Sequence, residues 1–355
     1  MRRSSAPLAG ALRATALVAL VVAIAPPPAS GAAVAGAPTQ ATGVPDGLDP
    51  KLAAAFARFD QAAPDQREAA RRAAEAVAAS RAGEPPWSLL VGTLWLMRGE
   101  WGSAEPWLRR AHAALPDSAP AAHALGVVLL QTSRPEEAET VLRPAVARFA
   151  ADPLQGDLRF NLAMACALVN RRLEASEWFE RAIELAPKAA ITHFSLAENE
   201  LNLGRLERAE AGFRQAMTLT PAHPDARWKL AVTLARRGQP AAAEALFREA
   251  VTAGPPASRL AATFQHGVFL FEQGRPADAL PALEAFTRER PGDRMAWSWR
   301  ARVERALGRK EAAQSSLTRY RELQAEADKS ETEFLLGLIR DKLTGGDGKA
   351  LPDGG

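Results

Sequence analysis

A 34-residue period runs through most of this 355-residue chain and limits its fold more than any other feature. The segments RFNLA (159–163), HFSLA (193–197) and RWKLA (227–231) begin at matching points of that period. Repeats of this length are typical of stacked helical units, each of which buries its apolar face against the next. The many Ala, Glu and Arg residues, with few β-branched runs, favour helices within each unit.

Four places in the repeat carry the pattern. In the unit 190–223 they are a small residue at the eighth place, Ala at the twentieth, a large residue at the twenty-fourth and Pro at the thirty-second: Ala197, Ala209, Phe213 and Pro221. Small residues allow two antiparallel helices to approach closely, the large one fills the space beside them, and the proline ends the unit. The pattern predicts seven units, at 85–118, 119–155, 156–189, 190–223, 224–259, 260–293 and 294–327.

A second set of positions predicts where the first helix of each unit ends. Seven residues after the small one stand Gly99, Ser133, Asn170, Gly204, Gly238, Gly274 and Gly308. Glycine adopts the left-handed conformation that terminates helices, and Asn is its best substitute. Most units place an apolar residue at the eleventh place, but two carry Glu200 and Glu304 there, which predicts looser packing in those units.

The pattern resembles the tetratricopeptide repeat (TPR) family, and Leu162, Leu196 and Leu230 before the small residue add to the likeness. The resemblance covers roughly two thirds of the chain. It implies an all-α fold, a right-handed superhelical solenoid of antiparallel helix pairs, and a role as a protein-binding scaffold. The chain departs from the family at two places, because the Trp at the fourth place occurs only as Trp297 and the Tyr at the eleventh place is missing.

The two ends of the chain differ from the repeats. Residues 1–35 have the three parts of a secretory signal peptide: a basic start, an apolar run at 14–25, and small residues after three prolines. Export, to a periplasm or out of the cell, is therefore predicted. Residues 36–47 and 345–355 are expected to be a disordered linker and tail. Residues 48–84 are interpreted as a degenerate helix pair that caps the solenoid, and 328–344 as a C-terminal capping helix.

Net charge argues against a nucleic-acid partner. Residues 1–35 contain three Arg and no acidic residue, so their removal lowers the basic count from 44 to 41, equal to the 41 acidic residues. A neutral chain has no overall field that attracts a polyanion. The run at 14–25 is also too short to span a bilayer, so no stable membrane span is expected after cleavage.

No arrangement of residues points to catalysis. The five histidines lack the spacing of metal ligands, and the glycines are used as helix stops rather than in a phosphate-binding loop. Cys166 is the only cysteine, which excludes an internal disulfide, and its apolar surroundings in the sequence predict a core position. We therefore expect no enzymatic activity, no cofactor and no bound metal.

The resemblance also implies which residues line the inner, concave wall of the solenoid. The fifth and sixth places of units three to six combine an aromatic ring with a polar or charged group: Phe160 and Asn161, Phe194 and Ser195, Trp228 and Lys229, Phe264 and Gln265. Such rings supply apolar contact area, and the polar neighbours satisfy a bound peptide backbone or carboxylate. The alternative, that these rings only pack between adjacent helices, stays open.

The last unit adds a basic group to that wall. Arg302 and Arg305 share one helical face and map beside Trp299. Together with the aromatic series they would suit an extended peptide with an acidic or carboxylate end. The alternative is a solvated arginine face without a ligand.

These features lead to one functional hypothesis with two alternatives. The first is a non-catalytic scaffold that binds segments of a protein or peptide partner in the concave groove, in the assembly of an envelope or secreted complex. The second is a self-associating structural adaptor, for which a homo-oligomer is needed. The third is an accessory or chaperone subunit of an exported enzyme system.

Overall fold

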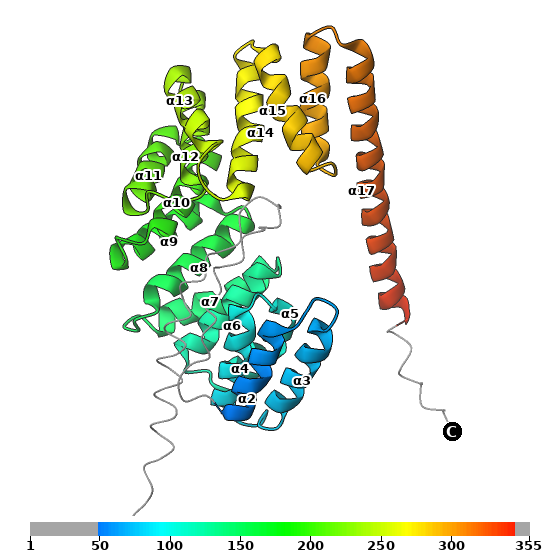
Figure 1. Cartoon of the computed structure of the whole chain (residues 1–355). Helices are drawn as coiled ribbons and strands as arrows, with labels where there is room; N and C mark the ends of the chain where they lie inside the picture. The colour runs from blue at the N-terminus through cyan, green and yellow to red at the C-terminus, as the bar shows by residue number, and fades with distance from the viewer. Residues whose placement is uncertain (1–48, 345–355) are drawn as a thin grey trace, which may run out of the picture. The chain divides into compact units, whose positions relative to one another are not determined.

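The structure, a computed structural model, describes residues 49–344, with side chains described for 49–329. All regular secondary structure in this part of the chain is α-helical (Figure 1). The helices are α2 (Pro50–Gln61), α3 (Arg67–Ala79), α4 (Pro85–Met97), α5 (Trp101–Ala114), α6 (Ala119–Gln131), α7 (Pro135–Arg148), α8 (Gln155–Leu168), α9 (Arg172–Leu185), α10 (Ala190–Asn202), α11 (Leu206–Leu219), α12 (Ala226–Arg236), α13 (Pro240–Ala250), α14 (Pro256–Glu272), α15 (Pro276–Glu289), α16 (Arg294–Ala306) and α17 (Lys310–Thr344). The predicted signal peptide (1–35), linker (36–47) and tail (345–355) lie outside the described residues.

Successive helices form pairs, and the pairs fall into two compact units, each larger than a single repeat, with the boundary in the sequence between Pro221 and Ala222. The first unit contains α2 to α11, and the second contains α12 to α17. Within each unit the first helices of neighbouring pairs pack on one another, as α6 does on α8 and α12 on α14. The second helix of each pair forms the other layer. The all-α prediction of antiparallel helix pairs is confirmed.

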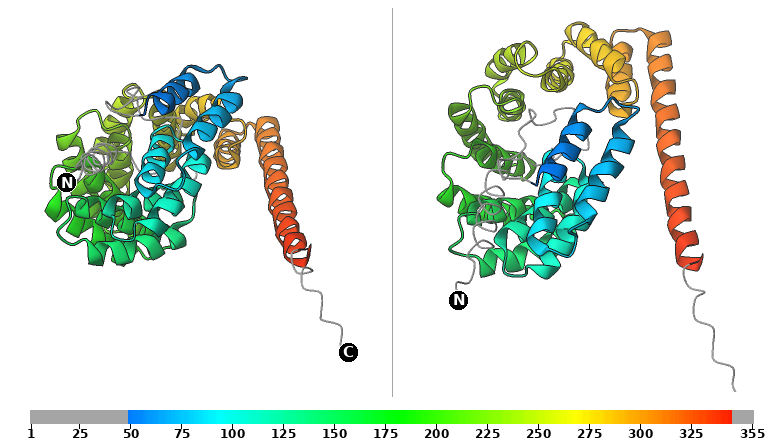
Figure 2. Two further views of the ribbon diagram at one scale, coloured as in Figure 1. Left: turned by 90° about the horizontal axis from the view of Figure 1, so that it is seen from below. Right: turned by 60° about the horizontal axis from the view of Figure 1, so that its bottom comes forward.

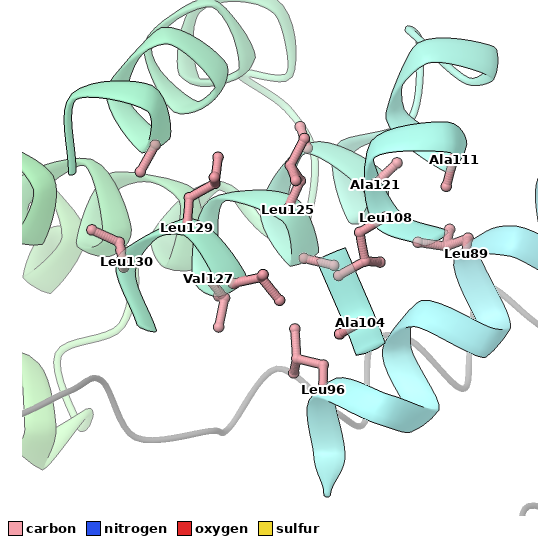
Figure 3. Close-up of a cluster of buried hydrophobic side chains, with 14 of the residues drawn as sticks. Leu89, Leu96, Ala104, Leu108, Ala111, Ala121, Leu125, Val127, Leu129 and Leu130 are labelled. Carbon is pink, nitrogen blue, oxygen red and sulfur yellow. The ribbon is translucent and has the colours of Figure 1, made fainter. Parts of the chain in front are cut away.

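Close approach of the paired helices depends on the small residue at the eighth place. Where that residue is glycine, its partner at the twenty-fourth place is leucine. A Cβ added to Gly92 would lie 2.6 Å from side-chain atoms of Leu108, and one added to Gly126 would lie 2.5 Å from Cδ2 of Leu142. Leu108 and Leu142 belong to a buried apolar cluster that extends from α2 to α9. Figure 3 shows a part of this cluster, with labelled side chains from α4, α5 and α6.

All seven predicted helix stops adopt the left-handed conformation. Five glycines do so, and so do Ser133 and Asn170, with φ of 57° and 63°. The residue after each stop donates its backbone N–H to the carbonyl at the eleventh place, as Arg134 does to Leu129 at 2.9 Å and Arg205 to Glu200 at 2.9 Å. This is the six-to-one bond of a Schellman motif, which satisfies a carbonyl at the helix end.

The glutamates at the eleventh place do not loosen the packing, which corrects the expectation from sequence. Glu200 is fully buried, and its carboxylate accepts a hydrogen bond from Oγ of Ser176 at 2.5 Å. Glu304 is 1% exposed and accepts hydrogen bonds from Nε of Arg300 at 2.8 Å and Oγ of Ser316 at 2.7 Å. Each buried carboxylate is therefore held by hydroxyl and guanidinium donors.

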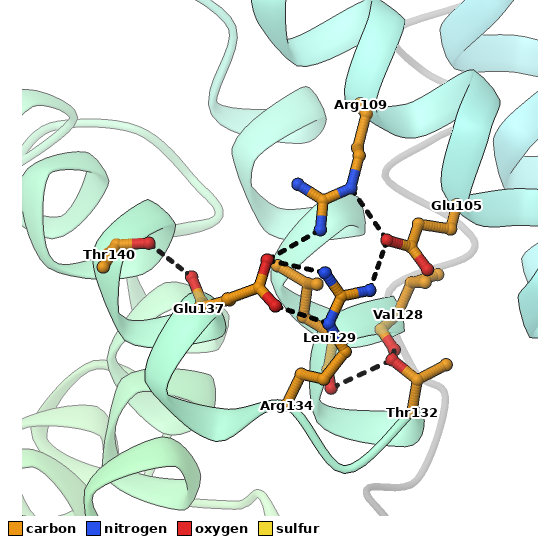
Figure 4. Close-up of polar contacts among 8 residues, drawn as sticks. All are labelled: Glu105, Arg109, Val128, Leu129, Thr132, Arg134, Glu137 and Thr140. Carbon is orange, nitrogen blue, oxygen red and sulfur yellow. Dashed lines mark hydrogen bonds and ion pairs between the residues drawn. The ribbon is translucent and has the colours of Figure 1, made fainter. Parts of the chain in front are cut away.

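Ion pairs on the second helices connect neighbouring pairs in the first unit (Figure 4). Arg134 donates to Glu105 of the preceding pair at 2.5 Å, and Arg109 donates to Glu137 of the following pair at 2.8 Å. Hydrogen bonds from Arg134 and Arg109 lower the pKa of Glu137 to about 2. Glu105 and Glu137 thus link neighbouring repeats.

Helices also occupy the two end segments. The segment expected to hold a degenerate pair contains α2 and α3, where Phe56 and Phe59 pack on Trp95 of α4 with ring centroids 4.6 and 5.0 Å apart. At the other end α17 runs without a break from Lys310 to Thr344. The helix expected within 328–344 is therefore the C-terminal part of α17 and not a separate element. None of the helices among residues 49–344 has both the length and the apolar composition needed to cross a bilayer.

Candidate functional site: the first-helix layer

The aromatic rings of the first unit pack against the second helix of their own pair. Phe160 of α8 contacts Phe179 of α9 with centroids 5.7 Å apart, and Phe194 of α10 contacts Phe213 of α11 at 5.5 Å. Phe160 is only 9% exposed and Phe194 only 7%. Both rings fit the alternative in which they only pack between helices, because this burial leaves no ring face for a ligand.

Their polar neighbours are also buried. Ser195 lies in the packed layer, and Nδ2 of Asn161 is 2.9 Å from Nε2 of His123. Burial lowers the pKa of His123 to about 4, so this imidazole is neutral near pH 7 and accepts the amide hydrogen. Sequence reasoning missed this pair, although its signal was present: His123 stands at the fifth place of the unit before Phe160. None of these four predicted residues is retained as a binding residue.

In the second unit the corresponding rings are only half-buried. Trp228 of α12 donates its indole N–H to Oδ1 of Asp225 at 2.8 Å, which fixes the ring in one orientation. The ammonium of Lys229 lies 4.5 Å from the centroid of the same ring. One ring face is therefore covered by the neighbouring cation, and the pair forms a preorganised aromatic and cationic surface.

The next pair continues the half-buried series. Phe264 of α14 contacts Phe286 of α15 with centroids 4.8 Å apart, and Gln265 beside it is half-buried as well. Leu283 occupies the place that Phe179 and Phe213 hold in their repeats, and Phe264 packs on Phe286, one turn further along α15. The predicted pairs in the second unit thus keep accessible surface.

A cluster of rings and guanidinium groups joins α14 to α16. Cζ of Arg302 lies 4.0 Å from the centroid of Trp299 and 5.5 Å from that of Phe271. Phe271 and Trp299 contact each other edge to face at 6.1 Å. Sequence reasoning predicted Trp299 and Arg302 but missed Phe271, which stands at the twelfth place of the preceding repeat, 260–293.

Arg302 and Arg305 are exposed, and within residues 49–329 neither forms an ion pair with a carboxylate. Contacts with two rings restrict the position of the Arg302 guanidinium while leaving its N–H groups as donors. We call Phe271, Trp299, Arg302 and Arg305 the arginine–aromatic cluster. Its chemistry suits a carboxylate or another oxyanion.

Among the described residues, the side chains that could act as a nucleophile or as metal ligands are buried or dispersed. Cys166 is a free, fully buried thiol, and burial raises its pKa to about 11, so it is a core residue as predicted. No set of three or more His, Cys, Asp and Glu side chains lies close enough to hold a metal in this part of the chain.

Comparison with known proteins identifies the fold. A family model described as tetratricopeptide repeat matches residues 123–190, 194–258 and 265–328, together more than half of the chain. A tetratricopeptide repeat protein from Parabacteroides merdae ATCC 43184 is similar in structure, with 16% identity and a TM-score of 0.55, over 67% of this chain and 93% of that one.

A second similar structure is the APC/C hetero-tetramer Cut9-Hcn1, with 14% identity and a TM-score of 0.56 over 73% of this chain. The match spans 49% of that chain, about half its length. At such identities the likeness shows the fold alone. No curated protein matches the chain. The repeat fold is generally a non-catalytic scaffold for protein interaction. The chain belongs to the tetratricopeptide repeat family.

Proposed function

We propose that the first-helix layer of the second unit binds an extended segment of a partner protein, with an acidic side chain or a terminal carboxylate at the arginine–aromatic cluster. The observation that carries this proposal is the position of Arg302 over Trp299 and Phe271, with its guanidinium exposed. A stacked guanidinium loses little side-chain entropy when it binds a carboxylate, so the site is preorganised.

The half-buried rings on α12 and α14 extend this surface along the second unit. Trp228 with Lys229, and Phe264 with Gln265, supply apolar area next to a hydrogen-bonding group. Those features support binding of a peptide backbone rather than of a single small anion. The setting we propose is assembly of an envelope or secreted complex, and its support is the signal-like sequence of residues 1–35.

Site-specific photo-cross-linking in cells tests the proposal. A photoreactive phenylalanine analogue replaces Trp299 in one variant and Tyr320, on α17, in a control variant. We expect a covalent partner adduct from position 299 and a much weaker one from position 320. Adducts from position 320 only would contradict binding by the first-helix layer. Export is tested by the mass of the protein from cells, and a mass that still includes residues 1–35 would contradict it.

A further inference from the structure

Helix α17 is much longer than the helix with which it pairs. At about 1.5 Å per residue its 35 residues extend about 52 Å, whereas the 13 residues of α16 extend about 20 Å. The two helices are antiparallel, and Nη1 of Arg294, the first residue of α16, donates to Oε1 of Gln324 at 2.6 Å. Residues of α17 after Gln324 therefore continue past the start of α16. In both views of Figure 2 the orange-to-red helix α17 extends well beyond the orange helix beside it.

The sequence of this extension has the spacing of a helix–helix seam. Positions 328, 331, 335, 338 and 342 alternate steps of three and four, which keeps them on one face. Leu335 and Leu338 occupy the middle of that face, with Phe334 and Ile339 at its flanks. An apolar stripe on a helix is normally covered, because leaving it in water costs free energy.

The charges at the ends of the stripe indicate what covers it. Glu331 stands at one end of the seam and Lys342 at the other. Two antiparallel copies related by a twofold axis between Leu336 and Gly337 place Leu335 opposite Leu338, and Glu331 opposite Lys342, on both sides of the axis. A parallel pair would instead place Glu331 opposite Glu331 and Lys342 opposite Lys342, which like-charge repulsion disfavours.

We propose that a second copy of this chain covers the stripe, through antiparallel pairing of residues 328–344 of α17. The interface is isologous, so each copy presents the same segment to the other. The seam is short, and we therefore expect a weak dimer whose population rises with protein concentration. This association is independent of the binding surface proposed on α12, α14 and α16.

Analytical ultracentrifugation of the full chain, over about a hundredfold range of micromolar concentration, tests the pairing. The expected result is a mass that rises from monomer toward dimer. E331K and K342E each place like charges together, and we expect each to weaken association at least fivefold. The double variant E331K/K342E restores opposite charges and should recover most of the loss. E326K, an exposed change on α17 away from the seam, is the matched control and should leave the mass unchanged.

Three results would overturn the proposal. One is a monomer at every concentration, and another is a dimer that neither single charge reversal weakens. The third is a monomer that binds vesicles of phosphatidylcholine and phosphatidylglycerol and loses that binding in L335D/L338D, which would assign the stripe to a membrane surface. Circular dichroism of each variant confirms that its helices are intact, so that loss of association is not loss of folding.

Discussion

Ser176 of α9 donates a hydrogen bond of 2.5 Å from Oγ to Oε1 of Glu200 on α10, so a fully buried carboxylate connects two neighbouring helix pairs. Arg208 also reaches Glu200, with Nε 3.3 Å from Oε2. Removing the carboxylate takes away the nearer acceptor of the serine hydroxyl, which keeps only the Arg172 carbonyl at 3.3 Å, and leaves an unfilled space in the layer.

We expect Glu200→Ala to lower the free energy of unfolding by about 2 kcal/mol or more, because Ser176 loses its shortest hydrogen bond and the packing of the buried carboxylate is lost. Urea unfolding followed by circular dichroism measures the change. Glu184→Ala, which removes an exposed carboxylate from α9, is the control and should have little effect. Equal stability of E200A and the unmodified chain would show that Glu200 does not stabilise this junction.

The same substitution at two helical glycines should change stability in opposite directions. At Gly126 an added Cβ meets Leu142 at 2.5 Å, so Gly126→Ala should destabilise by about 1–3 kcal/mol despite the better helix propensity of alanine. At Gly102 of α5 no atom lies within 4 Å of an added Cβ, so Gly102→Ala should stabilise by up to about 1 kcal/mol. Thermal unfolding of both variants measures the contrast, and a stabilising G126A would contradict the close helix approach.

His123 should make stability fall as the pH drops. Its pKa is lowered from 6.5 to about 4 in the folded chain by burial, so between these values the unfolded chain binds a proton that the folded chain does not. The stability is therefore complete above pH 6.5 and decreases toward pH 4, by at most about 3 kcal/mol.

His123→Gln should remove that pH dependence. The measurement is the difference in unfolding free energy between the unmodified chain and the variant at several pH values. A difference is needed because burial raises the pKa of Asp157 to about 6, and this carboxyl adds stability as the pH falls through the same range. A difference that stays constant from pH 7 to pH 4 would contradict a buried neutral imidazole.

Most of the repeat architecture was predictable, because its determinants are local. The left-handed stops at Gly99, Ser133 and Asn170 and the small residues at the eighth place follow from helix geometry, and the structure confirms them. The hydrogen bond between Ser176 and Glu200 was not predicted, because Ser176 belongs to the preceding repeat, 156–189. A signal existed: serine replaces there the glutamate found at the same place in other units, as at Glu105 and Glu139.

Exposure of the aromatic series could not be predicted from its spacing. Phe160 is buried because Phe179 receives its ring, whereas Phe264 has Leu283 at that place and packs on Phe286 instead. For Phe160 and Phe264 the difference lies in a residue about twenty positions away, whereas Trp228 is half-buried although Phe247 stands at the place of Phe179. The arginine–aromatic cluster likewise needs Phe271, which comes from a different unit than Arg302.

The most direct test of the account is the affinity of the full chain for an acidic peptide selected on it from a random library. Isothermal titration of that peptide should give an affinity at least tenfold lower for R302A/R305A than for the unmodified chain, because charge-assisted hydrogen bonds to the carboxylate are lost. R288A removes an exposed arginine from α15 and should bind like the unmodified chain. Undiminished binding by R302A/R305A, with helical content intact, would contradict a carboxylate-binding role for the arginine–aromatic cluster.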